Sequence, residues 1–288
     1  MRFLLLCSFF LCALCVSAFS LSPTVSQPSG SQTASDHTHA YLGFDRNIYP
    51  GDEALPILRK TFSFSSYWLS PPPGEKTNTW SGKRELLRKE GFGFLVLFRG
   101  RESGEVKTSP AAMEAGIKDG NEAAAAANSE GFASGTTIFI DIEEGGRLSP
   151  DYLAYILAWF EELQSAGYHP GVYCSGMPVE DTPGVTITTA DNIRSHTKSH
   201  DITFWVYNDA CAPSPGCVIP QNPPPPSQSG ISYAQIWQFV RSPRDKETAV
   251  HCSGYARNGH CYAPGDAAHT WFLDMNVATS PDPSGAAR

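Results

Sequence analysis

The sequence predicts an α/β fold and, within that class, a (β/α)8 TIM-type barrel in which some helices are reduced or replaced by loops. From Tyr41 onward, short β-like runs alternate with helical stretches over about 240 residues, a length typical of such a barrel. A doubly wound sheet is the competing fold, but no glycine-rich phosphate loop follows the first strand. The predicted strands are Tyr41–Asp45, Ser63–Leu69, Phe92–Phe98, Thr136–Glu143, Gly171–Ser175, Thr203–Tyr207, Tyr233–Phe239 and Phe272–Val277.

Three predicted helices lie between these strands. Ser149-Pro150 supplies an N-cap followed by a proline in the first turn, and apolar residues then recur at helical spacing from Leu153 to Leu163. A second helix opens at Ser109 and runs to Ala127, and its alanine-rich face suits close packing. The third covers Ser81–Glu90.

The N-terminus resembles an export signal. Arg2 precedes an apolar run, Phe3–Phe19, which ends in small residues that suit cleavage, so residues 1–20 are predicted to be a signal peptide. A retained anchor helix is the alternative, but the run is short for spanning a bilayer. The sequence then predicts a flexible Ser/Pro/Thr-rich linker at 21–40, a barrel domain at 41–280 and a disordered tail at 281–288. We therefore expect a secreted or extracytoplasmic protein with no membrane span after signal cleavage.

The cysteines agree with export. Cys211 and Cys217 form one close pair and Cys252 and Cys261 another, and each pair brackets a loop, so the sequence predicts two local disulfides. A metal site is the alternative, because a His precedes each cysteine of the second pair, but the spacing fits no standard zinc pattern. Cys174, in a predicted strand, is expected to be a buried free thiol.

The composition excludes two classes of protein. Hydrophobic residues make up 41% of the chain and charged residues only 17%, a balance that a disordered chain does not have. The formal net charge is -8, and removing the first twenty residues, whose only charge is Arg2, leaves -9. Nucleic acid is not expected as a partner, because binding phosphates requires a cationic surface.

Acidic residues cluster on the predicted strand Thr136–Glu143. Alternation sends its three isoleucines to one face and Phe139, Asp141 and Glu143 to the other. In a barrel, the aliphatic face would contact the helices, and the two carboxylates would lie at the catalytic rim formed by the C-terminal ends of the strands. Solvated carboxylates at an ordinary strand end are the alternative.

Two further acids are expected at the same rim. Asp45 ends the first predicted strand, and Asp274 lies in the last one, and these two strands are neighbours in a closed barrel. We therefore expect both to converge with Asp141 and Glu143, although a single Asp at a strand end is more often a cap.

Aromatic residues are predicted around this rim. Trp205 and Tyr207 alternate on one strand, Trp237 lies on the next, and the pair Tyr67-Trp68 lies on the second strand. Aromatic rings stack on sugar rings, so one interpretation is a carbohydrate groove. The four binding residues expected in it are Trp205, Tyr207, Trp237 and Tyr67. Ordinary core packing is the other interpretation.

Short motifs in the chain resemble a known family. Gly43-Phe44-Asp45, Asp141-Ile-Glu143, His169-Pro-Gly-Val-Tyr173, Phe204-Trp-Val206, Ile236-Trp-Gln238 and Asp274-Met-Asn276 follow the order seen in glycoside hydrolase family 25 lysozymes. The segment Glu114–Ala124, which runs toward the Ile-Asp-Ile-Glu strand, is more similar still to a related glycoside-hydrolase-like domain family of unknown function found in exported proteins.

The resemblance implies an acidic site in which Glu143 is the general acid, Asp141 lies beside it, and Asp45 and Asp274 line the site. One departure is that Arg46-Asn-Ile-Tyr49 stands where the lysozymes have a Ser and a Trp/His-Gln pair, which favours the uncharacterised relatives.

The expected function is hydrolysis of cell-wall or other polysaccharide glycosidic bonds, by a retaining or an inverting route, with no cofactor and no metal. Two alternatives are a non-catalytic carbohydrate- or wall-binding protein on the same barrel and an interaction domain that uses the Pro-rich loop 212–228.

Overall fold

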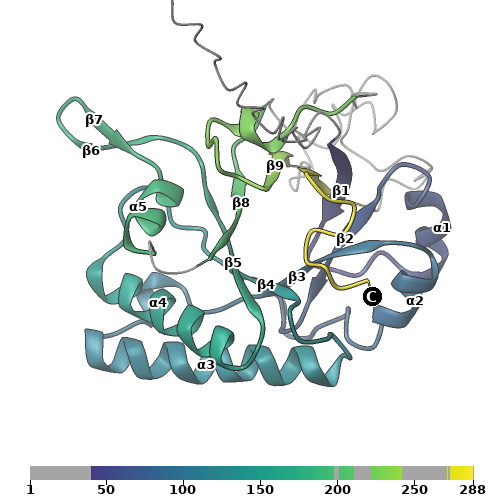
Figure 1. Ribbon diagram of the computed structural model, residues 1–288, viewed down its shortest axis with the longest axis horizontal. Helices are drawn as coiled ribbons and strands as arrows, with labels where there is room; N and C mark the ends of the chain where they lie inside the picture. The colour runs from purple at the N-terminus through teal and green to yellow at the C-terminus, as the bar shows by residue number, and fades with distance from the viewer. Residues whose placement is uncertain (1–39, 198–200, 211–221, 242–270, 272, 288) are drawn as a thin grey trace, which may run out of the picture. The chain divides into compact units, whose positions relative to one another are not determined.

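The computed structural model describes residues 40–197, 201–210, 222–241, 271 and 273–287. Eight strands form a closed barrel in the order β1-β10-β9-β8-β5-β4-β3-β2, which confirms the predicted barrel (Figure 1). The barrel strands are β1 (Tyr41–Asp45), β2 (Phe64–Trp68), β3 (Gly93–Phe98), β4 (Thr137–Asp141), β5 (His169–Ser175), β8 (Thr203–Tyr207), β9 (Ile236–Val240) and β10 (Asp274–Ala278).

The last strand departs from an all-parallel (β/α)8 barrel. β10 pairs antiparallel with both of its neighbours, β1 and β9, whereas the other adjacent barrel strands pair parallel. The N-terminal end of β10 therefore lies at the same end of the barrel as the C-terminal ends of the other strands, which we call the barrel mouth.

The helices are reduced, as predicted. The described helices are α1 (Leu55–Leu58), α2 (Arg84–Lys89), α3 (Ser109–Ser129), α4 (Pro150–Ser165) and α5 (Thr189–His196). The described part of the β8–β9 connection contains only the 3-10 turn η3 (Pro226–Ser229), and the other two such turns are η1 (Asp52–Ala54) and η2 (Ser103–Glu105). The hairpin β6 (Val179–Thr182) and β7 (Val185–Ile187), which the sequence did not predict, projects away from the barrel (Figure 1).

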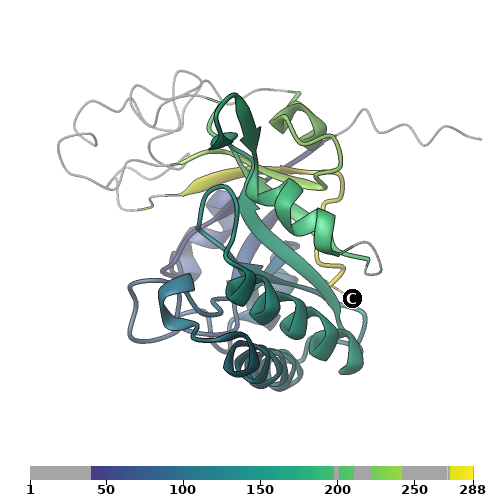
Figure 2. The same cartoon turned by 90° about the vertical axis from the view of Figure 1, so that its left-hand side faces the viewer.

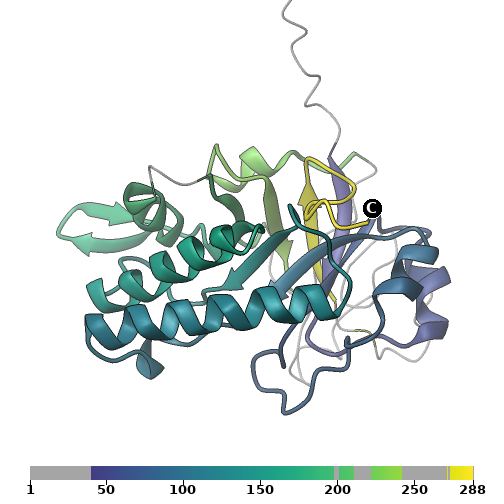
Figure 3. The same ribbon diagram turned by 60° about the horizontal axis from the view of Figure 1, so that its bottom comes forward.

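The two long helices lie side by side along their lengths (Figure 3). They cover one side of the barrel, while β9 and β10 lie on the opposite side (Figure 2). The Ser149 side chain caps α4 by accepting a hydrogen bond from the Tyr152 amide, as predicted. Gly116 of α3 allows the close approach, because a Cβ atom there would collide with the carbonyl oxygen of Tyr155 on α4.

The C-terminal residues differ from the expected disordered tail, because 281–287 pack against the base of β3 and β4. The Asp282 carboxylate accepts a hydrogen bond from the Phe94 amide at 3.0 Å, and the Ser284 hydroxyl accepts one from the Val96 amide at 2.9 Å. The carbonyl oxygen of Ser284 also accepts a hydrogen bond from the Thr137 amide at 2.9 Å. An irregular segment thus supplies hydrogen-bond acceptors to backbone amides of both β3 and β4. The composition of small and polar residues gave no indication of this.

Several predictions concern residues outside the described ones. They are the signal peptide at 1–20, all of the linker at 21–40 except Ala40, and the two disulfides formed by Cys211, Cys217, Cys252 and Cys261. Cys174 is described, and it is buried and free, as predicted; its burial raises the pKa of the thiol. None of the described helices combines the length and the apolar character that crossing a bilayer requires.

Candidate active site at the barrel mouth

Four carboxylates meet at the barrel mouth. Asp45 ends β1 and lies directly opposite Asp274, the first residue of β10. Asp141 ends β4, and Glu143 lies two residues beyond it. All four line one small cavity of about 30 Å³, together with Tyr173 and Trp205 among other residues. The predicted convergence of the four acids is therefore found in the structure.

The Asp45 carboxylate is held by two side-chain amides. Its Oδ2 atom accepts hydrogen bonds from Gln238 Nε2 at 2.9 Å and from Asn276 Nδ2 at 2.7 Å. The oxygens of these amides are used as well: the Tyr173 hydroxyl donates to Gln238 at 2.8 Å, and the Trp205 indole N–H donates to Asn276 at 2.8 Å. Because buried polar groups are costly unless they are hydrogen-bonded, this network fixes Asp45 and the floor of the site.

Asp141 lies in a different environment from Asp45. It is buried, and among the described residues its Oδ1 atom has no hydrogen-bond partner. Burial raises the pKa of Asp141 well above its usual range, and the carboxylates of Glu143, Asp45 and Glu144 raise it further, against a smaller opposite effect of Arg99. Burial and the neighbouring carboxylates therefore favour the protonated form of Asp141.

Glu143 is exposed and connects the mouth cavity to a neighbouring groove. This groove, which we call the acid groove, has a volume of about 330 Å³. It is lined by Pro73, Arg99, Arg101, Glu102, Asp141, Glu143, Glu144 and Tyr152. Arg99 donates to Glu102 at 3.1 Å, so its one ion pair at hydrogen-bond distance in the described part of the chain is with Glu102 and not with Glu143.

Two of the four predicted aromatic residues lie at the site. Trp205 points into the barrel, where its ring contacts Tyr173 with a centroid distance of 4.7 Å. Tyr207 lies at the rim, and its hydroxyl donates to the Glu143 carbonyl oxygen at 3.1 Å. The site could therefore offer aromatic faces to a sugar, but one of the two is largely covered.

The other two predicted aromatic residues do not line either cavity. Tyr67 is buried outside the barrel against Trp80 and Phe132, and its hydroxyl donates to Glu130 at 2.6 Å. Trp237 is buried on the face of β9 opposite to Gln238, and its indole N–H donates to a backbone carbonyl. Both are therefore packing residues.

Sequence reasoning placed Trp68 beside Tyr67 at the rim but chose Tyr67 as the binding residue. It gave no role in the site to Tyr173, Gln238 or Asn276, which also form it. Alternation could have found Asn276, which shares a face with Asp274, and Tyr173, which lies near the mouth end of its strand. Trp68 lines the mouth cavity in place of its neighbour Tyr67, and both faces of β2 are buried, so hydrophobicity gives no indication of which residue points inward.

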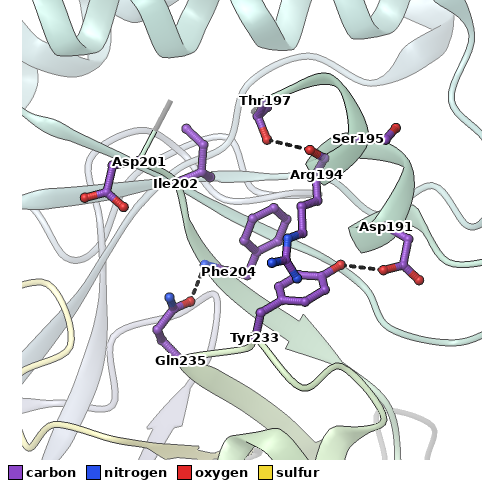
Figure 4. Close-up of a pocket in the computed structure, with 9 residues that line it drawn as sticks. All are labelled: Asp191, Arg194, Ser195, Thr197, Asp201, Ile202, Phe204, Tyr233 and Gln235. Atoms are coloured by element: carbon purple, nitrogen blue, oxygen red, sulfur yellow. Dashed lines mark hydrogen bonds between the residues drawn. The ribbon is translucent and has the colours of Figure 1, made fainter. Parts of the chain in front are cut away.

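A larger cavity lies elsewhere, between α5 and the start of β8 (Figure 4). It has a volume of about 600 Å³, and none of the four mouth carboxylates lines it. The Arg194 guanidinium lies 3.7 Å from the centroid of the Tyr233 ring, and the Tyr233 hydroxyl donates to Asp191 at 2.8 Å (Figure 4). Among the described residues, no three His, Cys, Asp or Glu side chains are arranged so that they could hold a metal ion together, and this includes the carboxylates of the mouth.

Several solved structures are similar to this chain. An uncharacterised protein from B. stearothermophilus is 19% identical, with a TM-score of 0.51, and the match covers 83% of this chain and 95% of that one. The Mycobacterium tuberculosis Tat-secreted protein Rv2525c is 15% identical, with a TM-score of 0.49 and coverage of 86% and 98%. A bacterial lysozyme from Streptomyces coelicolor is 12% identical, with a TM-score of 0.45 and coverage of 83% and 92%. The first of these agrees with the fold described above, and no curated protein sequence matches the chain.

The sequence pattern of one domain family matches a long segment of the chain. That family is described as the Rv2525c-like, glycoside hydrolase-like domain, and it matches residues 73–219, just over half of the 288 residues. The match includes α3, β4 and the carboxylates Asp141 and Glu143. The resemblance inferred from short motifs is thereby confirmed, and the chain belongs to the Rv2525c-like glycoside hydrolase-like domain family.

Proposed function

We propose that this protein binds a polysaccharide of the cell-wall type in the acid groove and hydrolyses its glycosidic bonds, with Glu143 as the general acid. The observation that carries the proposal is the convergence of Asp45, Asp141, Glu143 and Asp274 on one cavity that opens into a groove of about 330 Å³. That volume is at the lower end of the range for small-ligand sites, and a sugar ring would fit there.

Glycosidic cleavage requires a proton for the leaving oxygen and a negative group facing the oxocarbenium-like transition state. Glu143 is the one of the four acids that is exposed, so its carboxyl group can reach an oxygen between two sugars in the groove. Asp45, held by two amide donors, and Asp274 supply negative charge on the side of the mouth formed by β1 and β10. Asp141 lines the same cavity, and its raised pKa favours a protonated form that reduces the repulsion among the four groups.

A non-catalytic glycan-binding protein is the second candidate function. Two observations favour it: Glu143 is exposed to water, whereas a general acid is usually desolvated, and the small mouth cavity leaves little room beside Asp45. In this case the groove and the rim residue Tyr207 would hold a glycan without cleaving it.

We also propose that the protein acts outside the cytoplasm. The apolar N-terminal run and the Ser/Pro/Thr-rich segment after it support this, as does the Tat secretion of the similar protein Rv2525c. The glycans that such a protein meets are those of cell walls and extracellular matrices.

The test is a cleavage assay on peptidoglycan, chitin and β-glucan, in which new reducing ends are counted for wild type and Glu143→Gln. We expect release by wild type and a fall of about 10²-fold or more in the variant, as for the loss of a general acid. Glu122→Gln is the matched control, because Glu122 is an exposed carboxylate on α3 that pairs only with Lys118 in the described structure. Equal release by Glu143→Gln and wild type would exclude Glu143 as the acid. Retained binding with no release from any glycan would support the binding protein instead.

A further inference from the structure

Arg101 of the acid groove is held in place by a buried carboxylate on the outer helix α3. Asp119 is 5% exposed, and it accepts hydrogen bonds from Arg101 Nε at 2.7 Å and from Arg101 Nη2 at 3.0 Å. The Tyr155 hydroxyl of α4 donates to the same carboxylate at 2.8 Å. A two-point pair of this kind fixes the plane of the guanidinium group as well as its position.

The backbone of Arg101 is fixed as well. Its N–H donates to the Tyr155 hydroxyl at 3.0 Å, and its carbonyl oxygen accepts a hydrogen bond from the Tyr152 hydroxyl at 2.7 Å. Both tyrosines belong to α4, and their rings stack with a centroid distance of 5.9 Å. The residue is thus anchored at both backbone and side chain, far more firmly than a solvated surface arginine.

This anchoring leaves one edge of the guanidinium group available. The group has five N–H donors, and Asp119 uses the edge formed by Nε and Nη2. The outer edge, which carries the two Nη1 hydrogens and the second Nη2 hydrogen, has no acceptor among the described residues. The side chain is 33% exposed and lines the acid groove next to Glu143 and Glu144, so a bound molecule could supply that acceptor.

The other charges in the groove indicate what kind of acceptor would suit. Glu102, Glu143 and Glu144 line the same groove, so a second anion beside Arg101 would be repelled by three carboxylates. An uncharged sugar avoids this repulsion, because its hydroxyl and carbonyl oxygens accept from the arginine while its O–H and N–H groups donate to the carboxylates.

We propose that Arg101 is a substrate-binding residue, whose outer N–H edge donates to an acceptor oxygen of an uncharged sugar in the acid groove, and that Asp119 is its positioning residue. The proposal rests on the proposed function, since it assumes that a glycan occupies this groove. It also gives a role to the Glu114–Ala124 segment: Asp119 orients a groove residue, and Gly116 and Gly120 permit the close contact with α4 that brings Tyr155 to it.

The test measures binding separately from cleavage. The probes are the hexamer of N-acetylglucosamine, the hexamer of β-1,4-linked glucose and a hexamer of galacturonate, each titrated by calorimetry into Glu143→Gln protein. Arg101→Lys keeps the charge and loses the planar edge, and it should weaken the binding of a neutral hexamer about tenfold or more. Arg88→Lys is the matched control, because Arg88 forms a similar two-point pair with Glu85 on α2, outside the groove, and it should change Kd less than twofold.

The positioning role of Asp119 is tested by a double-mutant cycle. Asp119→Asn should weaken the binding of a neutral hexamer when Arg101 is present. In the Arg101→Lys background, the same substitution should raise Kd less than twofold further. A general loss of structure would instead raise Kd by the same factor in both backgrounds. The proposal would be overturned if the neutral hexamers bound equally well with Arg101 and with Arg101→Lys. It would also be overturned if the protein preferred the galacturonate hexamer. Both results would leave the proposed function standing. If Glu143→Gln protein bound none of the three hexamers, this proposal and the proposed function would both fail.

Discussion

Replacing Asp141 by Asn should change how the stability of the fold depends on pH. Asp141 is buried at the end of β4 with one carboxyl oxygen unpartnered among the described residues, and its pKa is raised by burial and by the carboxylates around it. The folded protein therefore binds a proton at this position that the unfolded chain releases. Asn has a similar shape to the protonated carboxyl group and cannot ionise.

Proton linkage gives the sign and the size of this change in the free energy of unfolding with pH. The stability that protonated Asp141 supplies is complete below the pKa of an unfolded Asp, about 3.9, and falls as the pH rises toward the raised pKa of the folded state. One proton of difference corresponds to about 1.4 kcal/mol per pH unit. The free energy of unfolding of Asp141→Asn, relative to wild type, should therefore increase with pH from about 4.5 up to the raised pKa of the folded state, with a slope that approaches about 1.4 kcal/mol per pH unit.

The assay is urea denaturation of both proteins at pH 4.5, 5.5 and 6.5. The relevant quantity is the free energy of unfolding of the variant minus that of wild type, plotted against pH. Its slope is used because any change in hydrogen bonding by the Asn amide shifts this difference equally at every pH. Asp181→Asn is the control: the Arg147 side chain lowers the pKa of Asp181, so this carboxylate stays ionised over the whole range and its difference curve should be flat. A curve for Asp141→Asn as flat as the control would refute the reasoning, because it would mean that Asp141 is ionised in the folded protein.

Three further substitutions test the packing around the site by urea denaturation. Asn276→Leu should lower the free energy of unfolding by about 3 kcal/mol, because it removes a donor to the buried Asp45 carboxylate; an unchanged midpoint would contradict the network. Ser284→Ala should cost about 1–3 kcal/mol by leaving the Val96 amide without its acceptor, whereas a truly disordered tail would give no effect. Gly116→Ala should cost about 1–3 kcal/mol, because the added methyl group forces α3 away from α4, and a neutral result would mean that the helices separate freely.

Strand positions in this barrel could be predicted from the sequence because local alternation and apolar runs depend only on neighbouring residues. Tyr41–Asp45 and Thr203–Tyr207 are found as predicted, and α4 begins at the capping residue that the sequence indicated. The packing of 281–287 could not be predicted in the same way, because it depends on backbone amides of β3 and β4 that are distant in the chain. Small polar residues are typical both of a disordered C-terminal tail and of an ordered segment such as 281–287, so they do not distinguish the two.

For the site, the carboxylates could be predicted and their partners could not. Strand ends are visible in the sequence, so Asp45 and Asp141 could be placed at the mouth. The raised pKa of Asp141 depends first on its burial in three dimensions, which the order of residues along the strand does not reveal. The sequence likewise does not show that Trp68 points inward and Tyr67 outward, because both faces of β2 are buried and both residues are apolar enough for either face.

The reversed direction of β10 explains how the mouth holds so many polar groups. In a parallel last strand, Asn276 would lie nearer the rim and Asp274 deeper in the barrel, so a carboxylate would be buried beneath the mouth. The antiparallel pairing exchanges their depths: Asp274 lies at the rim opposite Asp45, and Asn276 lies one alternation further in, opposite Gly43. An amide can satisfy both neighbours there without adding charge, since it donates to Asp45 and accepts from Trp205. The direction of one strand therefore places the carboxylate of Asp274 at the mouth beside Asp45 and the uncharged amide of Asn276 beneath them.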